Sequence, residues 1–344
     1  PPPPPTPAQY IVSIDGRMAT IFNIKTVGLN TFEKGKRIAE KLRWGNSGVG
    51  RETALDLAQR GARVILACRN LQKAEDVAKD IKSRTGNSEV VVRHLDLSSL
   101  QSVREFAQQI IETEDRLDIL INNAGAVTKD NFEFVFGTNH FGHFLLTNLL
   151  LDLVKKSALK RVVTVSSSLH ELSSGLNMTR EDQSVASFLY PHLQDYLSSK
   201  LANVLFAREL ASREKASGLV SISLHPGMTN TPIWQTNFAN VSPFMGALYR
   251  TAGAQTTLHC ALDESVAELS GKYFDNCAEY EPSPFAQDDE LAKELWTVSC
   301  EATGKINQWS TIAPHSNLLL MPSLYLVTGR GRNIGRNMLQ SGCG

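Results

Sequence analysis

The sequence predicts an α/β fold in which a doubly wound, mostly parallel sheet forms a single domain. Apolar runs typical of buried strands alternate with amphipathic segments of helical period along residues 45–304. Several of these runs end in polar or glycine-containing segments, as expected where a ligand binds beyond the carboxyl ends of parallel strands. The chain has 344 residues, 42% of them hydrophobic, and is long enough to bury such a core.

The predicted elements follow one another after a glycine-rich turn. The turn GNSGVG, at residues 45–50, leads into a helix and then into the first apolar run. The predicted strands cover residues 62–68, 89–95, 117–121, 161–165 and 220–224. The predicted helices include residues 71–83, 103–111 and 143–154, and a further helix that carries Tyr196 and Lys200. Strands that alternate with helices in this way indicate parallel pairing.

The two ends of the chain do not follow this pattern. We therefore expect three segments: an atypical N-terminal segment over residues 1–42, a central domain over residues 43–304, and an atypical C-terminal tail over residues 305–344. The prolines at the start supply no backbone donors and favour an extended, disordered tail. Residues 18–42 predict a short amphipathic helix and no buried strand.

Composition and charge exclude several classes of partner. The chain has 35 Lys and Arg residues against 35 Asp and Glu residues, and this balance argues against a nucleic-acid partner or a broad anionic membrane contact. Its five cysteines show no paired spacing for zinc or a redox dithiol, so we predict free thiols and no metal site. No apolar run reaches the roughly 18 to 20 residues of a membrane-spanning helix. A soluble or peripheral protein with a small-molecule partner is favoured.

Tyr196 and Lys200 lie one helical turn apart and therefore share one face of their helix. A tyrosine titrates near pH 10, and a neighbouring ammonium favours its phenolate. The pair could exchange a proton with a substrate, or it could be two common residues of a helix. The surrounding sequence decides between these interpretations.

A series of motifs in a fixed order resembles the short-chain dehydrogenase/reductase family over about Gly45 to Gly304. The series consists of GNSGVG, Asp96, NNAG at residues 122–125, Asn139, Ser167, Tyr196 with Lys200, and HPG at residues 225–227. The segments LACRN, NHFGHFLLTNLLL, SKLANVLF and LSGKYF are most similar to the retinol dehydrogenase branch. The resemblance implies a Rossmann-like fold and an oxidoreductase that acts on CH–OH groups.

The resemblance implies a set of catalytic residues. Tyr196 would be the acid or base that exchanges a proton with the substrate oxygen during hydride transfer, and Ser167 would hydrogen-bond that oxygen. Lys200 would lower the pKa of the phenol and bind the nicotinamide ribose, while Asn139 would hold a water that links Lys200 to solvent. From the residues alone, Ser167 could also belong to a solvated strand end, and Asn139 could be a helix cap.

The resemblance also implies a nicotinamide cofactor. Its site would comprise Gly45, Asn46, Ser47, Gly48, Gly50, Arg69, Asp96, Asn122, Ala124, Gly125, Tyr196, Lys200, Pro226, Gly227 and Thr231. Asp96 would meet the adenine, Gly125 would let the backbone approach the cofactor, and Asn122 would tie down the strand edges. Arg69, and no acid, follows the strand over residues 62–68, so we predict NADP rather than NAD, unless Arg69 only faces solvent.

Substrate, partners and location follow from the same resemblance. It implies a small lipophilic alcohol or carbonyl substrate such as a retinoid, and an endoplasmic reticulum location with membrane association, the cytoplasm being the alternative. Peripheral membrane association and a homo-oligomer are further expectations. A second function stays open, namely a catalytically impaired relative, from an aberrant gene model or splice form, that acts at most as a binding protein.

The first strand of the family pattern is missing or replaced. In the family that strand ends in Thr-Gly, where this chain has Arg43 and Trp44 after the charged segment RIAEKLR. Near the C-terminus, Leu324–Val327 is an apolar run followed by Thr328 and Gly329, as expected of the absent strand. Either this run fills the central position, as in a circular permutation, or an unrelated exon forms a disordered tail.

Overall fold

The computed structural model describes residues 48–125, 132–173, 175–176, 194–227 and 254–304, and the backbone of two short strands at residues 9–11 and 20–22. The chain divides into two units, Pro1–Gln308 and Trp309–Gly344, and all described residues belong to the first. Several residues singled out in the sequence lie outside the described part, namely Arg43, Trp44, Gly45, Asn46, Ser47, Thr231 and Leu324–Val327.

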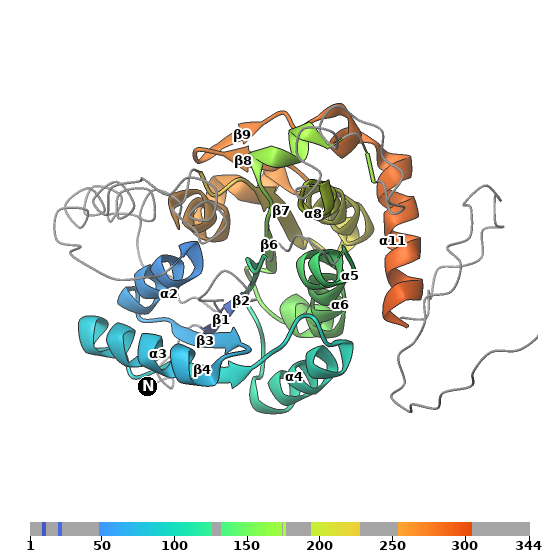
Figure 1. Ribbon diagram of the computed structural model, residues 1–344. Coiled ribbons are helices and arrows are strands. Elements are labelled where there is room, and N and C mark those ends of the chain that lie inside the picture. The colour runs from blue at the N-terminus through green and yellow to red at the C-terminus, as the bar shows by residue number, and fades with distance from the viewer. Residues whose placement is uncertain are drawn as a thin grey trace, which may run out of the picture. The chain divides into compact units, whose positions relative to one another are not determined.

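One sheet runs through the described residues (Figure 1). Its strands are β1 (Gln9–Ile11), β2 (Thr20–Phe22), β3 (Arg63–Cys68), β4 (Val90–His94), β5 (Ile119–Asn122), β6 (Arg161–Val165), β7 (Val220–Leu224), β8 (Tyr273–Asp275) and β9 (Ala278–Tyr280). β3 and β4 pair on one side of a central position, and β5 to β9 follow one another on its other side. These neighbours are parallel except in the β8–β9 hairpin.

The central position, between β3 and β5, is shared by two strands. Ile65 of β3 pairs with β4 on one side, and Leu120 of β5 pairs with β6. On their remaining sides, both residues are paired with Ile11 of β1 in the parallel direction and with Ile21 of β2 in the antiparallel direction. A strand in a sheet has one neighbour on each side. β1 and β2 are therefore both paired at the one strand position between β3 and β5.

This position corresponds to the first strand of the pattern that the sequence resembles. Residues 18–42 were expected to hold no buried strand, yet Thr20–Phe22 forms a strand, and the strand at Gln9–Ile11 was not predicted either. Each of the two strands is only three residues long, too short for an alternating or continuous apolar pattern to be recognised. The first strand is thus replaced by segments from the N-terminal part of the chain.

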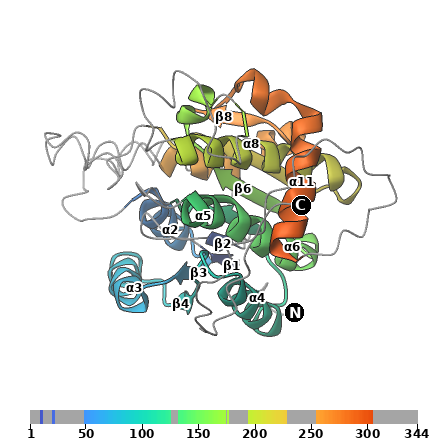
Figure 2. The same cartoon turned by 45° about the vertical axis from the view of Figure 1, so that its right-hand side comes forward.

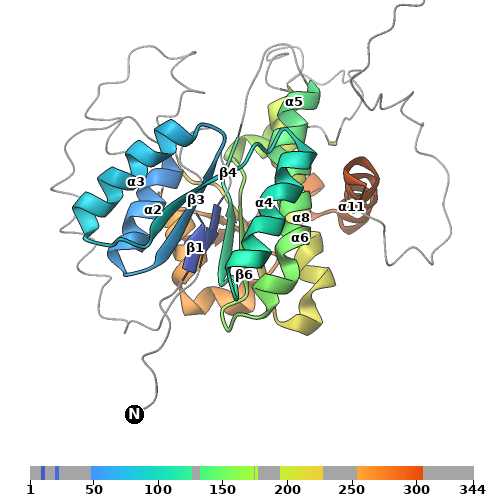
Figure 3. The ribbon, with the colours of Figure 1, turned by 90° about the horizontal axis from the view of Figure 1, so that it is seen from below.

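Helices cover both faces of the sheet (Figure 3). On one face lie α2 (Val49–Gln59) and α3 (Leu71–Thr85), and on the other lie α4 (Leu100–Thr113), α6 (Gly142–Lys155) and α8 (Gln194–Arg213). Asn70 caps α3 by accepting a hydrogen bond from the Lys73 amide, and Ser99 caps α4 by accepting one from the Ser102 amide. The predicted doubly wound α/β fold is confirmed.

The central strands are buried along their whole length. Every residue of β5, β6 and β7 is buried, as is β3 from Val64 to Cys68. Parallel strands that are covered on both faces need apolar side chains at successive positions, and this explains the continuous apolar runs in the sequence. The carboxyl ends of these strands open onto one edge of the sheet, where the polar segments of the sequence gather.

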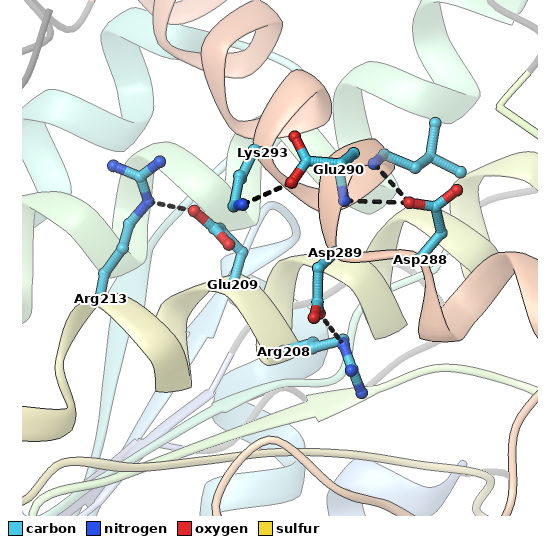
Figure 4. A network of polar contacts seen from close by, with 8 residues as sticks. Arg208, Glu209, Arg213, Asp288, Asp289, Glu290 and Lys293 are labelled. Atoms are coloured by element: carbon cyan, nitrogen blue, oxygen red, sulfur yellow. Dashed lines mark hydrogen bonds and ion pairs between the residues drawn. The ribbon is translucent and has the colours of Figure 1, made fainter. Parts of the chain in front are cut away.

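The C-terminal helix α11 (Asp289–Thr303) packs along α8 (Figure 2). Figure 4 shows the polar contacts between them: Arg208 Nε donates to Asp289 Oδ1 at 2.6 Å, and Arg213 Nε donates to Glu209 Oε1 within α8 at 2.7 Å. The Arg208–Asp289 pair is exposed, and such pairs contribute only about 0 to 1 kcal/mol each, whereas Glu209 of the second pair is buried. The buried residues Leu201, Leu205 and Leu295 lie in one apolar cluster at this contact, so apolar packing dominates it.

Candidate active site

Tyr196 and Lys200 lie on α8, which packs against β6 and β7. Both residues are buried, with 8% and 3% of their surfaces exposed. Lys200 Nζ lies 5.5 Å from the centroid of the Tyr196 ring and donates a hydrogen bond to the Val165 backbone oxygen at 3.0 Å. The amino group is therefore held at the carboxyl end of β6, next to the phenol.

Burial shifts both groups towards their neutral forms. It raises the pKa of Tyr196 from 10.0 to about 12, although a hydrogen bond with Ser167 acts in the opposite direction. Burial lowers the pKa of Lys200 from 10.5 to about 8. The causes of the Tyr196 shift do not include Lys200, so the expectation that Lys200 lowers the pKa of the phenol stays a prediction. Tyr196 keeps its proton at neutral pH.

Ser167 stands between the end of β6 and the 3-10 helix η3 (Ser168–Leu172). Its Oγ accepts a hydrogen bond from the Leu169 amide at 3.2 Å and is also hydrogen-bonded to the Tyr196 side chain. A serine at this position caps the helix that follows it. The same hydroxyl thus holds the turn and touches the phenol, and Ser167 is buried rather than part of a solvated strand end.

Asn139 lies in a π-helical turn, η2 (Gly137–Phe141), between α5 (Phe132–Phe136) and α6. Its Nδ2 donates to Ser199 Oγ at 2.9 Å, and that hydroxyl donates to the Tyr196 backbone oxygen at 2.8 Å. Single π-helical turns are frequent at functional sites, because the wider turn redirects a side chain. Asn139 is not a helix cap here; it is fully buried against the helix that carries Tyr196 and Lys200.

Ser199 was not predicted as a site residue. Its position next to Lys200 in the sequence gives no signal, because i and i+1 residues of a helix point in different directions. The contact with Asn139 depends on how η2 packs against α8, which sequence patterns do not reveal. The Val165 backbone oxygen was missed for the same reason, since any residue supplies a carbonyl.

The backbone of Gly125 lies close to Lys200 and Asn139. A Cβ added at Gly125 would lie 3.5 Å from Lys200 Nζ and 4.0 Å from Asn139 Oδ1. Gly125 follows β5 and Ala124, which is fully buried. A side chain at position 125 would fill the approach to both polar groups, and its absence fits a cofactor that passes close to the backbone.

The N-terminus of α2 fits the binding of a phosphate. Gly48 occupies the cap position and supplies no capping side chain; its backbone oxygen accepts a hydrogen bond from the Arg51 amide at 3.1 Å, and no side chain caps the amides of Val49 and Gly50. An added Cβ at Gly48 would meet no atom within 4 Å among the described residues. Helix N-termini bind phosphate through such amides and through the helix dipole. Gly50 is buried in the first turn of the same helix.

Arg69 and Asp96 face each other at the ends of β3 and β4. Arg69 Nη1 lies 3.9 Å from Asp96 Oδ2, and the Arg69 side chain is 41% exposed. Asp96 Oδ1 accepts hydrogen bonds from the amide and hydroxyl of Ser98. This ion pair was not predicted. It places the guanidinium at the predicted adenine end of the site, with donors left over for a further anion.

Asn122 and Gly227 have distinct structural roles at the ends of β5 and β7. Asn122 Nδ2 donates to Thr147 Oγ1 of α6 at 2.9 Å, so it ties β5 to a helix rather than to a neighbouring strand edge. Its Oδ1 is buried and has no hydrogen-bond partner among the described residues. Gly227 has a φ of 81°, a left-handed conformation that favours glycine. Pro226 lies beside it at the carboxyl end of β7.

His140 and His143 are core residues. His140 Nε2 is bonded to Ser299 Oγ at 2.8 Å, and His143 Nδ1 donates to the Asn139 backbone oxygen at 3.0 Å. Burial lowers their pKa values to about 3 and about 4, so both rings are neutral at physiological pH. Within the described part of the chain, no three His, Cys, Asp or Glu side chains are grouped as metal ligands.

The comparisons with known proteins decide the family. Residues 45–177 match the short chain dehydrogenase family. The chain is 43% identical to retinol dehydrogenase 13 of Homo sapiens over 275 residues, which cover 75% of this chain and 82% of the relative. The chain belongs to the short-chain dehydrogenase family, in its retinol dehydrogenase branch. It is accordingly an oxidoreductase that acts on CH–OH groups.

Further relatives support the assignment of this chain to the family. The chain is 45% identical to retinol dehydrogenase 11 of Homo sapiens over 276 residues, which cover 75% of this chain and 83% of the relative. A short chain dehydrogenase of Shigella flexneri complexed with NADP is 27% identical and has a TM-score of 0.55, covering 67% of this chain and 93% of that chain. A short chain dehydrogenase of Escherichia coli complexed with NADPH is 26% identical, with a TM-score of 0.54 over 67% of this chain and 92% of that chain.

Among the described residues, no helix combines the length and the apolar character that crossing a bilayer requires.

Proposed function

We propose that this dehydrogenase transfers a hydride between NADP(H) and a small lipophilic alcohol or carbonyl such as a retinoid, with Tyr196 as the acid or base. One observation carries the proposal. The Tyr196 phenol, the Ser167 hydroxyl and the Lys200 amino group meet at the carboxyl end of β6. Two hydroxyl groups this close together can both donate to one substrate oxygen once that oxygen replaces the hydrogen bond between them.

The residues of the chain would divide the work as follows in the reducing direction. Tyr196, whose proton is retained at neutral pH, gives that proton to the carbonyl oxygen as negative charge develops there. Ser167 Oγ donates a second hydrogen bond to the same oxygen. Lys200 binds the ribose hydroxyls, and Asn139 anchors α8 through Ser199. The nicotinamide would supply the hydride.

The cofactor preference rests on Arg69. Its guanidinium lies at the end of β3, where a ribose phosphate would add a negative charge, and it carries more donors than the pair with Asp96 uses. The complexes of the Shigella flexneri and Escherichia coli relatives with NADP and NADPH agree with this preference. The remaining predicted cofactor residues, Gly48, Gly50, Asn122, Ala124, Gly125, Pro226 and Gly227, stay part of the proposal.

The retinoid class of substrate rests on the relatives, whose names are retinol dehydrogenases. Membrane association at the endoplasmic reticulum and a homo-oligomer stay expectations from the same resemblance. Sedimentation with microsomal membranes and gel filtration of the purified chain test these two expectations separately.

The test is retinaldehyde reduction with NADPH by Tyr196→Phe. We expect at least about a hundredfold lower kcat, because general acid catalysis typically contributes a factor of about 10² to 10⁴. NADPH affinity, measured by fluorescence titration, should stay within about threefold of the wild type, because the cofactor contacts of Lys200 and Arg69 are intact. Tyr280→Phe, which changes a tyrosine that is 47% exposed on β9, is the matched control. Wild-type turnover by Tyr196→Phe would refute the mechanism.

A second candidate function is a catalytically impaired relative that binds cofactor or substrate without turnover. The observation that favours it is the central position of the sheet, which β1 and β2 share, beside the buried Oδ1 of Asn122 that has no partner among the described residues. The same titration separates the two candidates. Saturable NADPH binding without any retinaldehyde reduction by the wild type supports the impaired relative, and turnover supports the enzyme.

A further inference from the structure

His170 is fully buried in η3, three residues after Ser167. Its Nδ1 lies 2.7 Å from the Ser167 backbone oxygen, and its Nε2 lies 3.3 Å from the backbone nitrogen of Ser283. A carbonyl oxygen only accepts and an amide only donates. The proton of the ring is therefore on Nδ1, and Nε2 offers its lone pair to the Ser283 amide.

We propose that His170 is a positioning residue for Ser167: its neutral ring links the Ser167 carbonyl to the amide of Ser283 and so fixes where the Ser167 hydroxyl points. This inference rests on the proposed function, in which that hydroxyl donates to the substrate oxygen. In this role His170 acts through Ser167 and touches neither substrate nor cofactor. It also ties the segment before η6 (Pro284–Gln287) to the active site.

Hydrogen bonds from His170 fix the backbone of Ser167. The Ser167 carbonyl receives two hydrogen bonds from the same residue, one from the His170 amide at 3.1 Å and one from Nδ1 at 2.7 Å. Both constrain the backbone of Ser167, which is extended at φ −162° and ψ 150°. With the backbone fixed, the Ser167 side chain can hold its contacts with the Leu169 amide and with Tyr196.

The surroundings hold the ring itself in one orientation. The centroid of the His170 ring lies 4.8 Å from that of Tyr273 on β8, with an angle of 60° between the planes. Burial lowers the pKa of His170, so that the ring keeps the neutral form that both hydrogen bonds require. The His170 side chain thus contacts Ser167, Tyr273 of β8 and Ser283, which precedes η6. A displacement of a catalytic group by about 1 Å can cost about a hundredfold in rate.

Two substitutions at position 170 separate the contact with Ser167 from the contact with Ser283. His170→Asn can place its amide nitrogen where Nδ1 stands and keep the bond to the Ser167 carbonyl. His170→Gln can place its amide oxygen near Nε2 and keep the bond to the Ser283 amide while losing the donor to Ser167. Both variants lose the ring packing on Tyr273, so this loss does not distinguish them.

We expect His170→Gln to lower kcat for retinaldehyde reduction at least about tenfold, and His170→Asn to stay within about threefold of the wild type. NADPH affinity should be unchanged in both variants, because the change is confined to the turn that carries Ser167. Equal kcat values in the two variants would overturn the proposal. So would a parallel loss of NADPH binding and turnover, because it indicates general damage to the fold.

A second pair tests the link without changing His170. Ser283→Pro removes the amide that His170 Nε2 accepts from, and the φ of Ser283 is −53°, which a proline can adopt. Ser283→Ala keeps that amide and removes a hydroxyl that has no partner among the described residues. We expect a kcat about threefold or more below wild type in Ser283→Pro alone. Equal activity in both would overturn the link.

The outcome stays separate from that of the proposed function. If Tyr196→Phe keeps full turnover, the proposed mechanism fails whatever His170 does. If Tyr196→Phe is inactive while His170→Gln reduces retinaldehyde like the wild type, the proposed mechanism stands and the positioning role of His170 fails.

Discussion

At the scale of single residues, Tyr196 and Lys200 have opposite effects on stability as pH rises. The pKa of Lys200 is lowered to about 8, so between pH 8 and 10.5 the unfolded chain holds a proton that the folded chain has released. Stability therefore rises with pH in that window. The pKa of Tyr196 is raised from 10.0 to about 12, so its contribution falls with pH, and only above pH 10.

This difference predicts how Lys200→Met changes thermal stability. Between pH 8 and pH 10 the melting temperature of the wild type should rise relative to that of Lys200→Met, because only the wild type loses the buried ammonium in that range. Melting curves monitored by circular dichroism at about pH 8, 9 and 10 measure the difference. Lys79→Met, which removes an exposed lysine of α3, is the control. A difference that is constant or falls over this range would contradict the prediction.

The exposed ion pair at the end of β3 predicts the cofactor preference. In Arg69→Asp, two carboxylates at positions 69 and 96 should repel a ribose phosphate. The ratio of NADPH to NADH affinity should fall at least about tenfold, because a nearby like charge replaces an opposite one. Parallel titrations with the two cofactors measure the ratio. Lys82→Asp, an exposed change on α3, is the control, and an unchanged ratio in R69D would show that Arg69 serves only Asp96.

Sequence patterns could predict the site residues that have a fixed motif and could not predict their partners. Tyr196, Lys200 and Ser167 follow from spacing and from family order, and the structure brings them together. Ser199 and His170 act through hydrogen bonds that form only when η2, η6 and α8 pack in place. A serine or a histidine at those positions carries no local pattern, so tertiary contact alone reveals its role.

At the scale of elements, the start of α6 is limited by the loop that follows β4. A Cβ added at Gly142 would lie 2.4 Å from the Leu97 backbone oxygen and 3.0 Å from Leu97 Cβ. The neighbouring Gly137, in η2, has no atom within 4 Å of an added Cβ among the described residues. A side chain thus fits at Gly137 and clashes at Gly142, although both glycines belong to one continuous helical stretch.

Gly142→Ala should be destabilising for this reason. The clash involves backbone, which cannot rotate away, and overpacking of this kind typically costs about 1 to 3 kcal/mol. Urea unfolding measures the change in the free energy of unfolding. Gly137→Ala is the matched control and should be close to neutral, because alanine also has the better helix propensity. Equal stability of the two variants would show that α6 moves freely against Leu97.

Strands of four or more residues were predicted to within two residues at each end, and the strands of three residues were missed. The prediction for residues 161–165 and 220–224 agrees with β6 and β7, whose sequences RVVTV and VSISL contain the β-branched residues typical of strands. The hairpin of β8 and β9 was missed because its turn residues, Asn276 and Cys277, both have positive φ. Asparagine followed by glycine signals such a turn, whereas cysteine does not.

At the scale of the whole molecule, the sheet is complete only when a strand from one end of the chain lies between β3 and β5. The structure pairs N-terminal strands there, and the alternative of Leu324–Val327 from the sequence lies outside the described residues. A variant without residues 1–22 should therefore melt at a lower temperature than the full chain, because β3 and β5 lose their shared neighbour. A variant that ends at Gly304 should melt like the full chain. The reverse result would favour the C-terminal run as the central strand.

The shared position has a consequence for the cooperativity of unfolding. β3 with β4 and β5 with the strands that follow are joined as a sheet only through the segment between them, among the residues that the structure describes. A strand of three residues supplies few ladder hydrogen bonds to its neighbours. All-or-none unfolding requires that the halves of a domain stabilise each other strongly. We therefore expect the half that carries α2 and Arg69 to open before the half that carries Tyr196, so that the cofactor site is lost before the catalytic residues.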